Sequence, residues 1–473
     1  MIASMLRTLS AGTVLAAGVA LLIAKAGLAA TPPSINYLPA ASSLVVIGLD
    51  VSDDGATAMG FVSGDIGFIY RRDGIPQIFT VTGGQGTGGL SGMSADGSIF
   101  AGEFNSGPLP EYSPGWTQAA LYTIPSLLGT GSYTPIPRPP EAIRCDRNGV
   151  SVDDISHDGQ AIAVAVWAAC RTSPAIWRAD SGYTFLPELP GLESQSHKIW
   201  QLNRDGTAAA GWYQNGTGPG GRGGLVWSNG TLIRLDQPGQ TIVGEAYAIS
   251  PSGQWVAGTL GSPRLYRWSS SRGVEDLGAV FTAANPTQNN RRNPVAAAIT
   301  DDGNRIVGQH SFGIDRDAFI WTPQSGGIKL TTWLISRGLD LDAQFVRLTS
   351  CAGMSSNGRY LTGQYANDLT GEIGPFIIDL GPDHLACSAA DIANTDGEPG
   401  SDPDGSVDNG DFTVFFTAFF AEPGNPIALE ADIADTDGEL GIPWGSGIGG
   451  PDGQVDNGDF TAFFAVFFNG CPN

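Results

Sequence analysis

The stretch from Ala296 to Gly308 reads Ala-Ala-Ala-Ile-Thr-Asp-Asp-Gly-Asn-Arg-Ile-Val-Gly. A run of small and apolar residues leads into Thr-Asp-Asp-Gly, and a second apolar run ends at Gly308. Asp-Gly between two such runs is a strong hairpin signal, because these residues accept the backbone angles of a tight turn. The stretch therefore predicts two antiparallel strands joined at Gly303.

The same turn signal occurs seven times in the chain. The seven turns are Ser52–Gly55, Ser94–Gly97, Ser156–Gly159, Asn203–Gly206, Ser250–Gly253, Thr300–Gly303 and Ser355–Gly358. Successive turn glycines lie 42 to 62 residues apart, which is close to the period of a four-stranded propeller blade. A third strand with an aromatic residue follows each hairpin, as in Ala318-Phe-Ile-Trp321, and a weaker fourth strand closes the unit, as in Tyr183–Pro187.

We therefore predict a mainly β fold, a β-propeller of about seven blades over residues 31–381. The long interval between Gly97 and Gly159 leaves six or eight blades as alternatives. The seventh copy ends after its third strand at Leu380, whereas Ile35–Pro39 precedes the first copy and resembles a fourth strand. Because unpaired sheet edges promote aggregation, we expect this N-terminal strand to complete the last blade.

The copies resemble the HAF repeats of exported bacterial proteins. The shared features are the Ser/Asn-x-Asp-Gly turn, a strand ending in Gly, an Ala-Phe-x-Trp segment and a Leu-Gly close, over most of residues 45–380. The resemblance implies a propeller-like architecture, and the family supplies no settled activity to transfer.

Residues 387–473 contain one unit written twice, after a linker over 382–386. Each copy places oxygen-bearing side chains around a loop glycine, which is the ligand pattern that Ca²⁺ prefers. The expected calcium ligands are Asp391, Asn394, Asp396, Ser406, Asp408 and Asp411 in the first copy and Asp432, Asp435, Asp437, Gln454, Asp456 and Asp459 in the second. The register is EF-hand-like, with 8 or 15 residues inserted after the loop glycine and Asp rather than Glu at position 12.

Each loop is followed by five phenylalanines at helical spacing, Phe412 to Phe420 and Phe460 to Phe468, which predicts two amphipathic helices. The duplicated loops and helices, bracketed by Cys387 and Cys471, resemble the Cys-flanked GC-type dockerins of secreted planctomycete proteins. The resemblance implies a small α-helical module, calcium as cofactor and a cohesin-like protein partner.

The N-terminus predicts export. Arg7, the apolar run Ala11–Ile23 and the small residues before Thr31 are typical of a signal peptide over residues 1–30. No later stretch is long and apolar enough to cross a bilayer, so we expect a secreted or surface-attached protein without a membrane span. In an exported chain we expect disulfides between Cys145 and Cys170 and between Cys387 and Cys471, which leaves Cys351 as a free thiol.

The formal net charge of −23 disfavours nucleic acid as a partner. The repeated aspartates Asp54, Asp96, Asp158, Asp205 and Asp302 are interpreted as turn residues, because Ser252 and Asn357 replace the acid in two copies. Nothing in the sequence excludes two carboxylate pairs as catalytic groups: Asp153 with Asp154, and Asp315 with Asp317.

Two functions follow from these patterns. The first is a non-enzymatic propeller that recognises a carbohydrate or protein partner; the alternative is an extracellular polysaccharide-degrading enzyme, a glycoside hydrolase or lyase, anchored through its dockerin. Carboxylates with raised pKa values in the propeller channel would favour the enzyme, and a channel lined by small and apolar residues would favour the binding protein.

Overall fold

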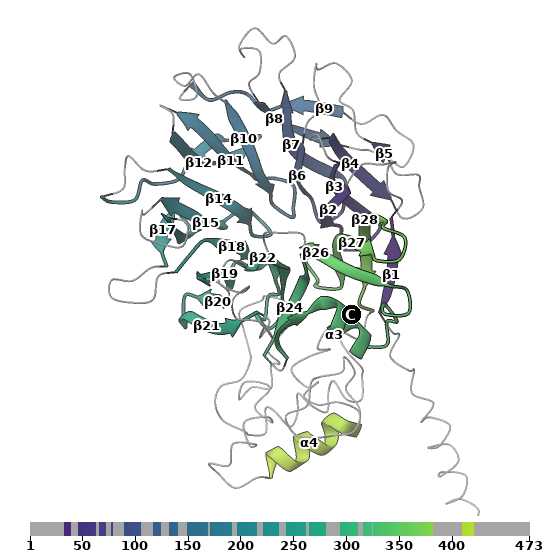
Figure 1. The fold of residues 1–473 in the computed structure, drawn as a ribbon. Coiled ribbons are helices and arrows are strands. Elements are labelled where there is room, and N and C mark those ends of the chain that lie inside the picture. Colours follow the sequence, from purple (N-terminus) through teal and green to yellow (C-terminus); the bar gives the residue numbers. More distant parts are fainter. Residues whose placement is uncertain are drawn as a thin grey trace, which may run out of the picture.

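A computed structural model gives the arrangement of the chain (Figure 1). It describes residues 33–38, 46–62, 66–71, 77–78, 89–105, 117–123, 132–140, 149–168, 171–191, 196–214, 221–235, 243–261, 264–280, 294–310, 316–323, 325–381 and 409–420. Within them, the strands form seven antiparallel four-stranded sheets arranged as the blades of a propeller. The prediction of seven blades is confirmed.

The blades follow one another along the chain. Blades 1 to 3 comprise β2 (Val46–Val51), β3 (Thr57–Val62), β4 (Ile66–Arg71) and β5 (Gln77–Ile78); β6 (Gly89–Met93), β7 (Ile99–Asn105), β8 (Thr117–Thr123) and β9 (Ser132–Pro135); and β10 (Val150–Ile155), β11 (Ile162–Ala168), β12 (Arg171–Arg178) and β13 (Gly182–Phe185). Blades 4 and 5 comprise β14 (His197–Leu202), β15 (Ala208–Gln214), β16 (Arg222–Ser228) and β17 (Thr231–Arg234); and β18 (Ala246–Ile249), β19 (Val256–Gly261), β20 (Arg264–Ser269) and β21 (Gly273–Ala279). Blade 6 comprises β22 (Pro294–Ile299), β23 (Ile306–His310), β24 (Ala318–Thr322) and β25 (Gly326–Lys329).

Blade 7 combines the two ends of the propeller. Its strands β26 (Val346–Met354), β27 (Tyr360–Asn367) and β28 (Ile373–Asp379) come from the C-terminal side, and β1 (Ser34–Tyr37) supplies the outer strand. Ile35 lies opposite Ile378, and Tyr37 opposite Phe376. The predicted closure by the N-terminal strand is confirmed.

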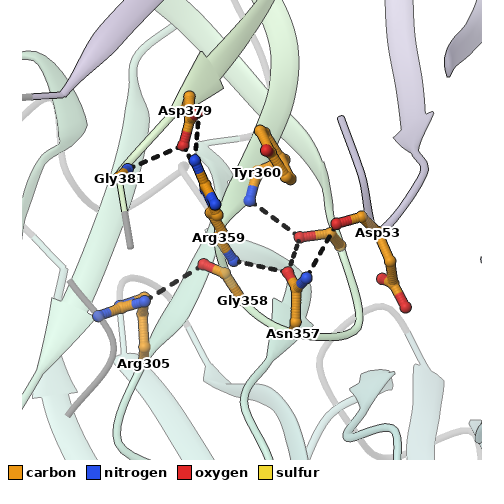
Figure 2. Close-up of polar contacts among 9 residues, drawn as sticks. Asp53, Arg305, Asn357, Gly358, Arg359, Tyr360, Asp379 and Gly381 are labelled. Atoms are coloured by element: carbon orange, nitrogen blue, oxygen red, sulfur yellow. Dashed lines mark hydrogen bonds and ion pairs between the residues drawn. The ribbon is translucent and has the colours of Figure 1, made fainter. Parts of the chain in front are cut away.

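The Asp-Gly turns join the first and second strands of the blades. In the second turn, Asp96 Oδ1 accepts the Ser94 hydroxyl at 2.6 Å and the Ser98 N–H at 3.0 Å. Gly97 has φ +67°, a conformation that glycine adopts without strain. Asn357 accepts the equivalent two bonds in the seventh turn (Figure 2). The turn interpretation is confirmed, because an amide replaces the acid without loss of these contacts.

Neighbouring turns are also bonded to one another. The N–H of Asp53 donates to the Ala95 carbonyl at 2.8 Å, and Ala95 donates in turn to the carbonyl of His157 at 2.9 Å. Similar bonds link blades 3, 4 and 5 through Arg204 and Pro251. These turn-to-turn bonds fix blades 1 to 5 against one another at one end of the ring.

Hydrophobic clusters fill the space between adjacent blades. One cluster joins Ala248, Ala257 and Leu265 of blade 5 to Ile306 and Phe319 of blade 6. Another buries Cys351 at the junction of blades 6 and 7. Cys351 is a free thiol, as expected, and burial raises its pKa.

Two helices occur among the described residues. The helix α3 (Leu330–Ser336) lies between β25 and β26 and packs Trp333 and Leu334 into the core; the sequence pattern did not predict it. The helix α4 (Asn409–Phe419) covers the predicted phenylalanine run. The rings of Phe412 and Phe416 stack at 4.5 Å within it.

Several predictions lie outside the described residues. They concern the signal peptide over 1–30, the linker over 382–386, Cys145, Cys170, Cys387, Cys471 and the calcium loops. Of the expected calcium ligands, Asp411 has a described backbone, within α4. No helix in the described part of the chain is long and apolar enough to cross a membrane.

Candidate functional site

The innermost strands share an irregularity that positions the candidate site. The first strands of neighbouring blades contact one another around the ring (Figure 1), and each has a β-bulge three residues before its turn. The bulged residues are Leu49, Ser91, Asp153, Trp200, Tyr247, Ala297 and Ala352. A bulge re-aims a side chain and often lies beside a functional site. Blades 3, 4 and 5 place an acid and two large aromatic residues there, whereas the other four blades place small or aliphatic ones.

Residues around these three bulges form a connected group, which we call the blade 3–5 cluster: Asp153, Lys198, Trp200, Arg222, Glu245 and Tyr247. Lys198 Nζ lies 2.7 Å from Asp153 Oδ1 and 4.7 Å from the centre of the Trp200 ring. The indole N–H of Trp200 donates to Glu245 Oε2 at 2.8 Å. The rings of Trp200 and Tyr247 are nearly parallel, with centroids 6.3 Å apart.

Glu245 connects the cluster to the second and third strands of blade 4. Its Oε1 accepts from Arg222 Nη1 at 2.9 Å, and the Arg222 guanidinium covers the Trp212 ring at 3.8 Å. Each charged group of the cluster therefore has an opposite partner. Lys198, Arg222 and Glu245, fixed around two aromatic rings, can therefore donate and accept hydrogen bonds while the cluster keeps its charges paired.

Burial dominates the electrostatics of Asp153. Its side chain is 1% exposed, and this desolvation raises its pKa to about 7, although the Lys198 ammonium opposes the shift. Burial likewise raises the pKa of the Tyr247 hydroxyl, with Glu245 adding to the effect. Asp153 thus lies behind Lys198, where a ligand in the ring cannot touch it directly.

In blades 1, 3 and 4, the side chain of the residue after the bulge connects the blade to the next one. Asp50 Oδ2 accepts the N–H of Met93 at 3.2 Å, and Asp154 Oδ2 accepts the N–H of Leu202 at 2.7 Å. Gln201 Oε1 does the same for the N–H of Ile249, at 2.8 Å. Burial raises the pKa of Asp50 to about 7 and that of Asp154 well above its ordinary value. These side chains act as links between blades.

The carboxylates that the sequence left open as catalytic groups have separate partners in the structure. Asp153 and Asp154 are adjacent, but the first pairs with Lys198 and the second with the backbone of blade 4. Asp315 lies outside the described residues, and Asp317 pairs with Lys329 at 3.0 Å on the outer part of blade 6. Within the described ranges, no group of three or more His, Cys, Asp or Glu side chains could hold a metal ion.

Of the cluster, sequence analysis named Asp153, as one of a pair of candidate carboxylates, and it did not predict the roles of Lys198, Arg222, Glu245 and Tyr247. A signal was present: the third residue before the turn is acidic or aromatic in copies three to five and small or aliphatic elsewhere. The bulge at this position cannot be predicted from hydropathy, because each copy still alternates small and apolar residues.

Comparison with protein-family models and with curated proteins gave no match. Among solved structures, the chain is similar to a protein described as TolB from Agrobacterium tumefaciens. The two share 15% sequence identity with a TM-score of 0.36, and the alignment covers 53% of this chain and 90% of the other. The propeller fold of this chain rests on its own seven-sheet topology.

Proposed function

We propose that the protein is an exported, non-enzymatic propeller that binds a neutral carbohydrate. A calcium-dependent dockerin-like module then docks it to a cohesin-type partner. The observation that supports binding is the blade 3–5 cluster, in which Trp200 and Tyr247 present nearly parallel rings beside paired charged groups.

The chemistry of the cluster favours a sugar over an ionic ligand. The flat faces of Trp200 and Tyr247 suit the apolar face of a pyranose ring, and Lys198, Arg222 and Glu245 offer donors and acceptors for its hydroxyl groups. Because the cluster balances its own charges, a polyanion or polycation gains little there. A protein partner that inserts an aromatic side chain is the competing outcome of the test.

A glycan array followed by calorimetric titration of the full-length protein tests the proposal. We expect one class of neutral oligosaccharide to bind, and Trp200→Ala to weaken that binding by at least about tenfold. Trp255→Ala is the matched control, since the Trp255 ring also lies 4.7 Å from a cationic group, that of Arg267, but outside the cluster. Binding that survives Trp200→Ala, or an array with no neutral glycan bound, contradicts the proposal.

The dockerin part of the proposal needs a separate test. The duplicated oxygen-ligand loops and the helix α4 over the first phenylalanine run support it. Pull-down of the full-length protein by cohesin domains, with and without EDTA, tests calcium-dependent docking. Retention that EDTA leaves unchanged contradicts calcium dependence.

A second candidate function, polysaccharide hydrolysis, is favoured by one observation. Asp50, Asp153 and Asp154 all have raised pKa values on innermost strands, as general acids often do. Against it, Asp153 is 1% exposed and Asp50 accepts two backbone N–H groups. Release of reducing sugar that is abolished by Asp153→Asn would establish the enzyme.

A further inference from the structure

A cavity lies on the outer side of the junction between blades 6 and 7, away from the blade 3–5 cluster. It is lined by β25, α3, the segment that follows α3, and the start of β26, and has a volume of about 460 Å³. This volume is within the range of about 300–1,000 Å³ typical of small-molecule sites. The connection departs from the blade pattern, since it inserts a helix and a loop before blade 7.

The loop presents an aromatic side chain in an unusual backbone conformation. Phe345 lines the cavity and is 55% exposed, and its φ is +55°. Bulky residues rarely adopt this left-handed region, and such residues cluster at ligand-binding positions. An exposed phenylalanine there contributes little packing to offset its strain, so folding alone does not explain it.

The surrounding structure holds Phe345 in place from both sides. Its N–H donates to the Asp342 carbonyl at 3.0 Å, and its own carbonyl accepts the N–H of Asp368 at 2.9 Å. The neighbouring Gln344 accepts the Tyr37 hydroxyl through its side chain at 2.8 Å and the Asn367 amide through its carbonyl at 3.1 Å. The ring is therefore presented by a fixed loop, which lowers the cost of binding.

The charged groups of the cavity resemble those of the blade 3–5 cluster in kind. Lys329 Nζ lies 3.0 Å from Asp317 Oδ2. Arg347 lies 3.7 Å from Asp368 Oδ1, and its other nitrogen donates to the Arg316 carbonyl at 2.9 Å. Lys and Arg retain further N–H donors, and the carboxylates retain lone pairs. These charged groups can therefore form hydrogen bonds with the hydroxyl groups of a ligand that lies on the ring of Phe345.

We infer that this cavity is a second carbohydrate subsite, with Phe345 as the platform for a pyranose ring and Lys329, Asp317 and Arg347 as hydroxyl partners. The inference rests on the proposed function for its ligand class. Two separated subsites on one propeller would let it bind two segments of one polysaccharide, which raises the apparent affinity for long chains.

The test is calorimetric titration of the full-length protein with cellohexaose, xylohexaose, mannohexaose and, as a basic probe, hexalysine. For at least one hexasaccharide we expect two sites on the natural protein and one site on Phe345→Gly. Trp200→Ala should lose the other site. If the natural protein has one site, and Trp200→Ala removes it while Phe345→Gly leaves it intact, this inference is overturned and the proposed function stands. If Phe345→Gly removes the one site while Trp200→Ala leaves it intact, the inference stands and the role of the blade 3–5 cluster is overturned.

Failure of all hexasaccharides to bind overturns both, and hexalysine binding that Phe345→Gly abolishes overturns the carbohydrate assignment here. Thermal unfolding adds a readout that needs no ligand. Glycine relieves the positive φ, so Phe345→Gly should raise the melting temperature by about 1–2 °C. Asn229→Gly, at φ +48° in another blade, is the matched control: it should leave both sites unchanged. A fall in melting temperature for Phe345→Gly shows a structural role for the ring and overturns the inference.

Discussion

The backbone N–H of Ser356 donates to Asp53 Oδ1 at 2.6 Å, joining residues that are 303 positions apart. The Asn357 side chain adds a bond to the Asp53 carbonyl at 2.9 Å, and Arg359 next to it is held by both oxygens of Asp379 (Figure 2). These contacts connect the last turn of the propeller to the first, at the same junction that β1 closes on the outside. The ring therefore has two independent closures, one at its turns and one at its outer edge.

Removal of the outer closure should weaken the whole propeller. A chain lacking residues 31–40 exposes the edge of β28 and loses Leu38, which is 2% exposed. Calorimetry should show one cooperative unfolding transition, at a lower temperature than that of the full-length protein. An unchanged melting temperature would show that the turn contacts alone hold the ring closed.

A single substitution gives a finer measure of the same junction. Leu38 packs with Val51 and Tyr70 of blade 1 and with Tyr360 and Ile377 of blade 7. Leu38→Ala should lower the free energy of unfolding by about 2–5 kcal/mol, because it leaves a cavity between the two blades. Leu369→Ala, at a residue 71% exposed, is the control and should change it by less than about 0.5 kcal/mol.

The turn glycines should differ in what they tolerate. Gly303 and Gly326 both have positive φ, at +71° and +61°. A Cβ on Gly303 would lie 2.5 Å from the Trp255 ring, whereas one on Gly326 meets nothing within 4 Å. Gly326→Ala should cost about 1 kcal/mol from the backbone alone, and Gly303→Ala clearly more. Equal losses in chemical denaturation would refute the steric contribution.

Stability should depend on pH through the buried acids. The pKa of Asp153 is about 7 in the folded protein and near 3.9 in an unfolded chain. Between these values the folded state holds a proton that the unfolded state has lost, so the free energy of unfolding falls as pH rises from about 4 to 7. Asp153→Asn should make this fall smaller, while Asp50 and Asp154, whose pKa values are also raised, keep part of it. A free energy of unfolding that rises between pH 4 and pH 7 would contradict the raised pKa of these buried acids.

The C-terminal module should respond to calcium. Its proposed loops gather carboxylates that repel one another without a cation. We expect far-UV circular dichroism of the full-length protein to show less helix in EDTA and a gain on adding Ca²⁺, whereas Mg²⁺ at the same concentration should restore less. A spectrum that does not change when Ca²⁺ is added would contradict calcium binding by these loops.

The repeat, the seven turns and the strand that closes the ring could all be predicted from the amino-acid sequence. These features are local: Asp-Gly sets a hairpin wherever it occurs, and the unmatched strand at Ile35 follows from counting the copies. The same applies to α4, since the spacing of Phe412, Phe415 and Phe416 defines one helical face.

Which residues contact one another depends on how the blades pack. Asp153, Trp200 and Tyr247 lie at bulges in the first strands of three blades, and contacts between these blades join them into one cluster. The backbone at Phe345 is likewise held by a bond from Asp368 to Phe345 and a bond from Tyr37 to the neighbouring Gln344, which join segments distant in the sequence. Hydropathy records whether a residue is apolar, but side-chain direction and backbone strain arise from pairing between strands that the sequence does not place side by side.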